Sequence, residues 1–229
     1  MPLVSLRGIT KDYLLGRTVV PALRGVDLDV EPGEFTVVMG PSGSGKTTLL
    51  NIIGCLDRPT SGTYSLDGQP IGERDFDDLA ELRNRRIGFI FQSFNLIPVL
   101  NVLENVEFPV LLRGRRGPDL DRRVRAIAGE VGLSPFLKHR PDELSGGQRQ
   151  RVAIARALVT EPGLVLADEP TANLDSVTSE QIVDLMLQLN RESGVTFLFS
   201  THDPQVTRHA RRVVKLADGR VVGDGAAPP

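Results

Sequence analysis

Gly40-Pro41-Ser42-Gly43-Ser44-Gly45-Lys46-Thr47-Thr48 matches the pattern G-x-x-x-x-G-K-[ST] of a phosphate-binding P-loop. The apolar run Phe35-Thr36-Val37-Val38-Met39 precedes this stretch, and the apolar-rich run Leu49-Leu50-Asn51-Ile52-Ile53 follows it. The order predicts a strand, a glycine-rich loop and a helix, which is the context that the motif requires. The first expectation is therefore a nucleoside triphosphate site in an α/β fold. The motif by itself does not indicate what the nucleotide is used for.

The residue types in this loop suit a bound phosphate chain. Glycine lets the backbone turn its N–H groups inward towards an anion, and the N-terminus of the following helix adds a partial positive charge. Lys46 is expected to contact the β- and γ-phosphates, and the Thr47 hydroxyl is expected to ligate Mg²⁺. The candidate nucleotide ligands in the loop are Gly40, Ser42, Gly43, Ser44, Gly45, Lys46, Thr47 and Thr48.

The composition limits the class of protein. The chain has 229 residues and a formal net charge of −2. This length suits one α/β domain with a small subdomain, and the near-neutral charge gives no basis for bulk attraction to nucleic acid. No apolar run approaches the roughly 18–20 residues of a spanning helix, and the N-terminus lacks a signal-peptide pattern. We therefore expect a cytoplasmic protein that contacts a membrane only through a partner. The single cysteine, Cys55, is expected to fill space in the core.

Strand and helix patterns alternate along most of the chain. Residues 3–8 and 26–30 are predicted strands of an antiparallel flap, with Tyr13 and Gly16 in the loop between them, and Asp67-Gly68 predicts a tight hairpin. Further strands are expected at 87–91, 164–169 and 195–200, and a last hairpin at 213–216 and 220–223. Helices are expected at 75–85, at about 145–159 and after Asp175, which suits an N-cap. Disorder is expected from Gly225 onwards, with 226–229 as a tail.

The segment from 93 to 140 lacks strand signals and is predicted to be helical. Asn101 and Glu104 resemble an N-cap and its partner for a helix to about Leu112, and a second helix is expected from about Asp119 to Val131. We interpret this segment as a small helical subdomain inserted in the α/β core. The apolar residues between 94 and 112 exceed what a short connector needs. They indicate either a docking surface for a partner or the subdomain's own small core.

Polar residues follow three predicted strands at their carboxyl ends, where ligands bind in open α/β sheets. Asp168 and Glu169 end one apolar strand, so Asp168 is expected to hold Mg²⁺ through water and Glu169 to activate the attacking water. Gln92 follows another strand and could reach the metal or a water, or could be a surface amide. His202 follows a third strand and could donate a hydrogen bond to a phosphate oxygen.

A second candidate anion site opens the helix at 145–159. Ser145-Gly146-Gly147-Gln148 offers a hydroxyl and bare N–H groups at a helix N-terminus, next to Leu144. One P-loop already binds the phosphates. We therefore expect two copies of the chain to pair head to tail, so that this loop caps the γ-phosphate held by the partner's P-loop.

Taken together, the motifs resemble those of the ATP-binding subunit of an ABC transporter over about residues 3–223. The run Leu144-Ser145-Gly146-Gly147-Gln148, between Gln92 and the strand that ends at Asp168 and Glu169, makes the resemblance specific. It implies an α/β fold: a P-loop NTPase core with a mainly parallel sheet, an N-terminal antiparallel β subdomain and an inserted helical subdomain. It also implies that Tyr13 stacks on adenine, whereas its position alone favours packing on the core.

The resemblance has further implications. One ABC ATPase domain would span 1–225, with the core and β subdomain at 1–92 and 160–225 and the helical subdomain at about 93–159. Catalytic roles fall to Glu169, His202, Lys46 and Gln92, metal binding to Thr47, Gln92 and Asp168, and the cofactors are ATP and Mg²⁺. The partners are a second copy and a separately encoded integral membrane permease, which would place the chain on the inner face of the membrane.

Stretches at 39–62 and 87–98 resemble the macrolide-export and lipoprotein-release subgroup. Alternatives are an importer subunit, a non-transport ABC ATPase of DNA repair, and a regulatory module that holds ATP without hydrolysing it. The short interval from Gln92 to Leu144 without sustained heptads argues against the DNA-repair alternative, and the presence of Glu169, His202 and Lys46 argues against the regulatory one.

Overall fold

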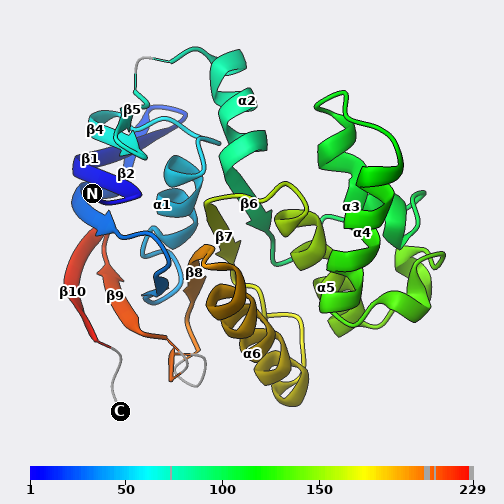
Figure 1. Ribbon diagram of the computed structural model, residues 1–229. Helices are drawn as coiled ribbons and strands as arrows, with labels where there is room; N and C mark the ends of the chain where they lie inside the picture. The colour runs from blue at the N-terminus through cyan, green and yellow to red at the C-terminus, as the bar shows by residue number, and fades with distance from the viewer. Residues whose placement is uncertain (73, 204–206, 209, 227–229) are drawn as a thin grey trace.

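The protein is described by a computed structural model of residues 1–72, 74–203, 207–208 and 210–226, which contains two β-sheets and a group of helices (Figure 1). One sheet has the order β2-β1-β4-β5 and is antiparallel throughout. Its strands are β1 (Val4–Leu15), β2 (Thr18–Val30), β4 (Ser61–Leu66) and β5 (Gln69–Pro70). It confirms the predicted antiparallel β subdomain.

The second sheet has the order β10-β9-β3-β8-β7-β6 and is parallel except for its last hairpin. Its strands are β3 (Phe35–Met39), β6 (Ile87–Ile90), β7 (Leu164–Asp168), β8 (Thr196–Thr201), β9 (Arg212–Ala217) and β10 (Arg220–Ala226). β3 lies inside this sheet, between β9 and β8, so the loop after Met39 emerges at the centre of its carboxyl edge. The parallel core confirms the predicted fold class.

Within the described residues, the helices that accompany the sheets are α1 (Lys46–Ile53), α2 (Phe76–Arg86), α3 (Val102–Leu111), α4 (Pro118–Glu130), α5 (Gly146–Leu158) and α6 (Ser176–Ser193), besides short 3₁₀ turns at Ser134–Phe136 and Pro141–Glu143. The predicted caps are present. Asn101 and Glu104 form a capping box at α3, and Asp175 accepts from the Thr178 N–H at α6. Figure 1 shows α3, α4 and α5 grouped to one side of the sheet, beyond β6.

Two hydrophobic cores lie on opposite faces of the parallel sheet. Successive residues of a strand point to opposite faces, so Val37 joins one core and Val38 the other. The Val37 core continues into α3, α4, α5 and α6, and the Val38 core continues into α1 and the antiparallel sheet. This two-sided burial explains why the strands are continuous apolar runs. Cys55 is 4% exposed in the second core, as expected of a core residue.

Two expectations about the strands were wrong. Tyr13 does not lie in a loop: β1 and β2 continue to Leu15 and Thr18 as one long hairpin, in which Tyr13 pairs with Val20 and Gly16 makes the turn at a φ of 64°. Cross-strand pairing holds this outer half in strand form although its apolar side chains, such as Leu14 and Val19, are exposed and cover no core. Gly225 and Ala226 belong to β10 and are not a disordered tail, while residues 227–229 lie outside the described part of the chain.

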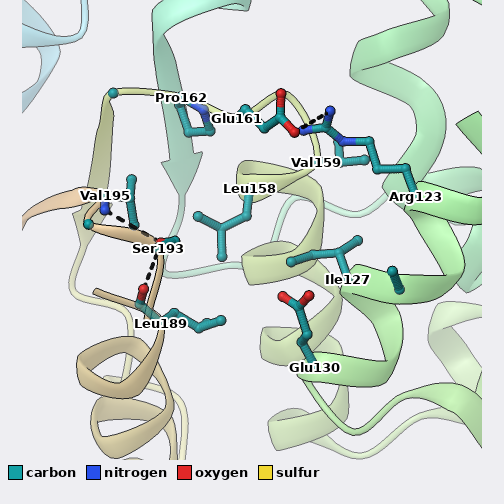
Figure 2. A pocket seen from close by; sticks show the side chains of 13 residues that line it. Arg123, Ile127, Glu130, Leu158, Val159, Glu161, Pro162, Leu189, Ser193 and Val195 are labelled. Atoms are coloured by element: carbon teal, nitrogen blue, oxygen red, sulfur yellow. Dashed lines mark hydrogen bonds and ion pairs between the residues drawn. The ribbon is translucent and has the colours of Figure 1, made fainter. Parts of the chain in front are cut away.

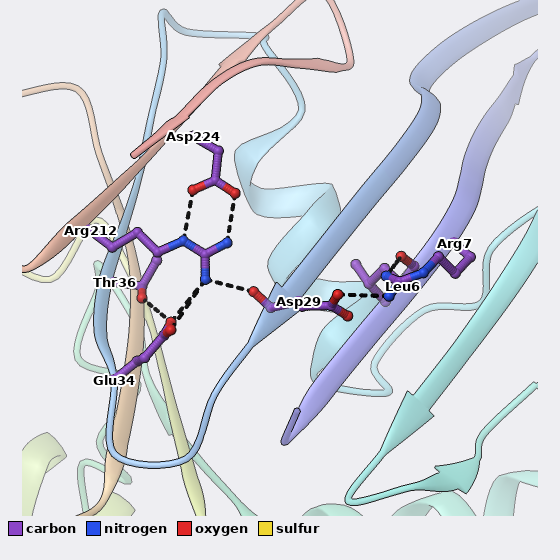
Figure 3. Close-up of polar contacts among 7 residues, drawn as sticks. All are labelled: Leu6, Arg7, Asp29, Glu34, Thr36, Arg212 and Asp224. Carbon is purple, nitrogen blue, oxygen red and sulfur yellow. Dashed lines mark hydrogen bonds and ion pairs between the residues drawn. The ribbon is translucent and has the colours of Figure 1, made fainter. Parts of the chain in front are cut away.

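An ion-pair network joins the two sheets at the end of β3 away from the P-loop (Figure 3). Arg212 on β9 binds Asp224 of β10 through two hydrogen bonds of 2.6 and 2.7 Å and reaches Glu34 at 3.0 Å. It also donates to the Asp29 carbonyl oxygen on β2 at 2.7 Å. The Asp29 side chain in turn accepts from Arg7 of β1. The hydrogen bond with Asp224 is the largest cause that raises the pKa of Arg212.

Candidate functional site

A cavity of about 590 Å³ lies at the carboxyl edge of the parallel sheet, around the P-loop. The loop residues Pro41, Ser42, Gly43, Gly45, Lys46, Thr47 and Thr48 line it, together with Ala22, Gln92, Glu169, Ala172 and His202. The topology therefore brings together residues more than 150 positions apart in sequence. The carboxyl edge is where α/β sheets bind ligands.

The P-loop backbone has the shape that its glycines permit. Gly43 and Gly45 have φ values of 77° and 103°, in the left-handed region that favours glycine. A Cβ on Gly40 would lie only 2.1 Å from the Leu216 carbonyl oxygen, so no larger residue fits there. Within the described residues, the buried Ser44 hydroxyl has no hydrogen-bond partner. A turn built on left-handed glycines, at the start of α1, fits a phosphate chain.

Lys46 lies under the loop with only 7% of its side chain exposed. Its ammonium donates to the Gly40 carbonyl at 2.8 Å and to the Pro41 carbonyl at 3.1 Å, and it lies 3.5 Å from Glu169 Oε1. The loop's own carbonyls thus hold the ammonium at the cavity, where a phosphate oxygen can become its partner.

Thr47, which lines the cavity, contacts Asp168, which lies next to the lining residue Glu169. The Thr47 hydroxyl donates to Asp168 Oδ1 at 3.2 Å, and the Ser200 hydroxyl donates to the same oxygen at 2.6 Å. A hydroxyl and a carboxylate at this separation form an oxygen donor set that suits Mg²⁺. Ser200 was not among the predicted site residues. The signal available was a polar residue ending the apolar run 195–199, at the carboxyl end of β8.

Glu169 and His202 form a pair beside the P-loop. His202 Nδ1 lies 2.9 Å from Glu169 Oε2, within hydrogen-bond distance. Glu169 has a φ of 47°, and its N–H donates to the Ser200 hydroxyl at 3.0 Å. A strained backbone held in this way at the end of β7 turns the carboxylate into the cavity.

Gln92 follows β6 and lines the same cavity. Its main-chain carbonyl oxygen accepts a hydrogen bond from Asn173 Nδ2 at 2.9 Å, so the segment that follows Glu169 is bonded to the segment that follows β6. The structure thus places Gln92 at the cavity rather than elsewhere on the surface. Its role towards a metal or water remains a prediction.

Tyr13 lies beside the P-loop helix but does not line the cavity. Its hydroxyl donates to Asp57 Oδ2 at 2.8 Å, and Lys11, which donates to Asp57 Oδ1 at 2.6 Å, lies 4.9 Å from the ring centre. Burial is the largest cause that raises the pKa of Tyr13, whereas a hydrogen bond with the Thr48 side chain lowers this pKa. Burial alone would raise the pKa of Asp57, but the hydrogen bonds from Lys11 and Tyr13 lower it. Adenine stacking on Tyr13 remains a prediction, and Asp57 was not foreseen.

The run Ser145–Gln148 does not line the cavity of its own chain. Ser145 caps α5, with the Gln148 N–H donating to the Ser145 hydroxyl at 3.3 Å and the Gln148 side chain accepting from the Ser145 N–H at 2.8 Å. A Cβ on Gly147 would lie 2.6 Å from Thr178 Cγ2, so the loop packs closely on the start of α6. The contact of these residues with a nucleotide held by a second copy remains a prediction.

A second cavity, of about 440 Å³, lies between α4, the α5–β7 connection and the end of α6 (Figure 2). Apolar side chains such as Ile127, Leu158 and Leu189 line it, and an Arg123–Glu161 ion pair of 2.7 Å closes one side. It lies where β7 and β8 begin, the amino edge of the sheet. None of the predicted site residues lines it, in the part of the chain that the structure describes, so the P-loop cavity is the candidate site.

None of the helices in the described residues combines the length and apolar character needed to cross a bilayer. The ABC transporter family model matches residues 23–172 of the chain. The lipoprotein-releasing system ATP-binding protein LolD of Anaeromyxobacter dehalogenans is 51% identical over 225 residues, 98% of this chain and 94% of that protein. The macrolide export ATP-binding/permease protein MacB of Syntrophobacter fumaroxidans is also 51% identical over 229 residues, but the chain spans only 32% of its length.

The fold also agrees with the solved structure of a similar protein. The ATP-binding cassette MJ0796, an ABC transporter ATP-binding protein of Methanocaldococcus jannaschii, has a dimeric structure of a post-hydrolysis state bound to ADP and Pi. It superposes with a TM-score of 0.90 at 45% identity, covering 99% of both chains. On the site geometry and these similarities, the chain belongs to the ABC transporter family, as an ATPase of the group that includes LolD and MacB.

Proposed function

We propose that this chain hydrolyses ATP as a homodimer and thereby drives a membrane subunit of the export or lipoprotein-release type. One observation carries the proposal: the P-loop, Glu169 and His202 line one cavity, whereas Ser145–Gln148 lies outside it. An isolated chain would thus hold half of a closed site. The dimeric structure of the similar cassette MJ0796 supports the same arrangement.

The residues of the cavity divide the work of phosphoryl transfer, which is mostly positioning and charge neutralisation. The P-loop amides and Lys46 hold the phosphates, and Tyr13 orients the base. Thr47, Gln92 and Asp168 would hold Mg²⁺, which neutralises charge on the phosphates when bound. Glu169 accepts a proton from the attacking water, since its carboxylate already faces the cavity beside His202. Ser145 and the Gly146, Gly147 and Gln148 backbone of a second copy complete the γ-phosphate site.

The helical segment at about 93–159 would form the subdomain that contacts the membrane subunit. A groove of about 480 Å³ runs between α2, β6, α3 and α5, and its wall includes Phe89, Phe91, Leu112 and Arg156. Leu112 in this wall is 66% exposed, and Val99, elsewhere in the helical segment, is 72% exposed. A partner that covers this surface would place the chain at the inner face of the membrane. LolD and MacB, as named, support the export or release assignment.

The test is Glu169→Gln, which removes the proton acceptor but keeps the side chain's size. We expect ATP turnover to fall by about 10²–10³-fold, while the variant elutes as a nucleotide-bound dimer in gel filtration with ATP. Glu192→Gln, at the exposed end of α6, is the matched control and should behave as the unchanged protein. A Glu169→Gln variant that stays monomeric with ATP at high protein concentration contradicts the proposal.

A further inference from the structure

The turn that follows Gln92 has an unusual backbone. Phe94 and Asn95 have φ values of 62° and 47°, so two consecutive residues that are not glycine are left-handed. Asparagine tolerates this region, but phenylalanine does so only when the surroundings impose it. Local hydrogen bonds from the Phe94 N–H to Phe91 O and from the Asn95 N–H to Ser93 O are present but do not involve the two carbonyls that this conformation turns outward.

Arg156 of α5 takes both of those carbonyls. Its Nη2 donates to Phe94 O at 2.8 Å, and its Nη1 donates to Asn95 O. The contact joins residues more than 60 positions apart. A guanidinium carries several donors in a fixed plane and can hold two acceptors at once, whereas a lysine ammonium is a single point charge.

Arg156 is partly buried at this contact, whereas Asn95 is exposed. Burial lowers the pKa of Arg156, and that is the cause found for its shift. Seven residues earlier on the same helix, Arg149 lies 5.1 Å from the ring centre of Phe94. Two arginines on one side of α5 therefore hold one turn, and Ser145 is the N-cap of the same helix.

The segment that contains Gln92 and this turn is also bonded to the loop after Glu169, because Asn173 Nδ2 donates to the Gln92 main-chain carbonyl at 2.9 Å. Gln92 thus lies between an anchor near Glu169 and the turn held by Arg156. We propose that Arg156 is a positioning residue for Gln92: by gripping the Phe94 and Asn95 carbonyls, it fixes the backbone that presents the Gln92 side chain to the nucleotide site. This rests on the proposed function, in which Gln92 helps to hold Mg²⁺.

The placement also has a consequence for the groove. Arg156 and Asn95 both line the groove between α2, β6, α3 and α5. A segment that enters this groove lies against the side chain that sets the Gln92 turn.

The experiment compares Arg156→Gln and Arg156→Lys with Arg151→Gln as the matched control. Arg151 lies on the same helix and also donates to a backbone carbonyl, that of Val131, but does not touch the turn. The first readout is hydrogen exchange of the peptide that contains residues 92–96. We expect faster exchange in both Arg156 variants and no change in the control.

The second readout is the binding of a fluorescent ATP analogue at rising Mg²⁺ concentration. For Arg156→Gln we expect the half-saturating Mg²⁺ concentration to rise several-fold and turnover to fall about tenfold, while the affinity without Mg²⁺ stays the same. Arg156→Lys should recover only part of the loss. In a Gln92→Ala background, Arg156→Gln should have less than about a twofold further effect, because both changes then remove one function.

Additive effects of the two substitutions, or unchanged exchange at 92–96, would overturn the proposal. A stability loss alone would appear equally in Arg151→Gln and would leave the Mg²⁺ dependence unmoved. Absence of ATP turnover in the unchanged protein would instead contradict the proposed function. If Arg156→Gln does not fold, Arg156→Lys carries the same comparison.

Discussion

Replacing Arg212 by alanine should test how strongly the two sheets are joined. Arg212 makes hydrogen bonds to Asp224, Glu34 and the Asp29 carbonyl, and its side chain is 23% exposed (Figure 3). The variant leaves two carboxylates without their cation, Glu34 at 26% and Asp224 at 35% exposure.

The magnitude follows from this partial burial. Breaking a fully buried pair costs about 3–5 kcal/mol, whereas an exposed pair contributes about 0–1 kcal/mol. With roughly a quarter to a third of each side chain in contact with water, the expected loss lies between these limits, at about 2–3 kcal/mol. For a chain of this length, that loss lowers the melting temperature by roughly 4–12 °C.

Urea unfolding followed by circular dichroism measures the loss. Arg211→Ala, at the exposed neighbouring residue, is the control and should change the free energy of unfolding by less than about 0.5 kcal/mol. Arg212→Lys should give an intermediate loss, because it keeps the charge but cannot bind Asp224 through two parallel bonds. The reasoning is refuted if Arg212→Ala is as stable as Arg211→Ala.

Three further predictions address the nucleotide site and the core. Ser145→Arg should abolish hydrolysis but keep the affinity of the monomer for ATP within about threefold of the unchanged protein, since Ser145 lies outside its own chain's cavity. Loss of ATP binding, measured by fluorescence titration, would place Ser145 inside that cavity. Asp57→Ala should raise the KM for ATP several-fold with little change in kcat, because it removes the hydrogen-bond acceptor of the Tyr13 hydroxyl. An unchanged KM would show that Asp57 has no part in binding the adenine base. Burial raises the pKa of Cys55 to about 11, so at pH 8 only about one thiol in a thousand is ionised. A thiol reagent should therefore label Cys55 rapidly only after unfolding. Fast labelling of the folded chain would contradict its burial.

Much of the fold follows from local patterns. The P-loop, the capped starts of α3 and α6 and the buried strands β3, β7 and β8 each have a signal within a few residues, because turns, caps and apolar periodicity act over short distances. The length of the β1–β2 hairpin did not follow. Its outer half has exposed side chains, apolar ones such as Leu14 and Val19 included, and the pairing of the two backbones keeps it in strand form without a buried face.

Most residues that line the cavity were among the predicted site residues, but Ala22 and Ala172 were not, and the sheet order brings all of them together. The order β3-β8-β7-β6 puts the ends of four strands at one edge, so Lys46, Glu169 and His202 come within contact distance. Ser200 and Asp57 were missed because their importance lies in what they contact, the Asp168 carboxylate and the Tyr13 hydroxyl. A hydrogen bond across more than 30 positions leaves no mark in local composition.

The sequence by itself determined the ligand class, because a glycine-rich turn before a helix binds phosphate through its backbone wherever it occurs. It also determined the fold class, through strands that are apolar on both faces. Only the tertiary structure decided that Gly147 packs closely on the start of α6, and that Arg156 holds the turn after Gln92. Both depend on how α5 packs beside the sheet, which is set by the summed contacts of distant segments and by no single stretch of sequence.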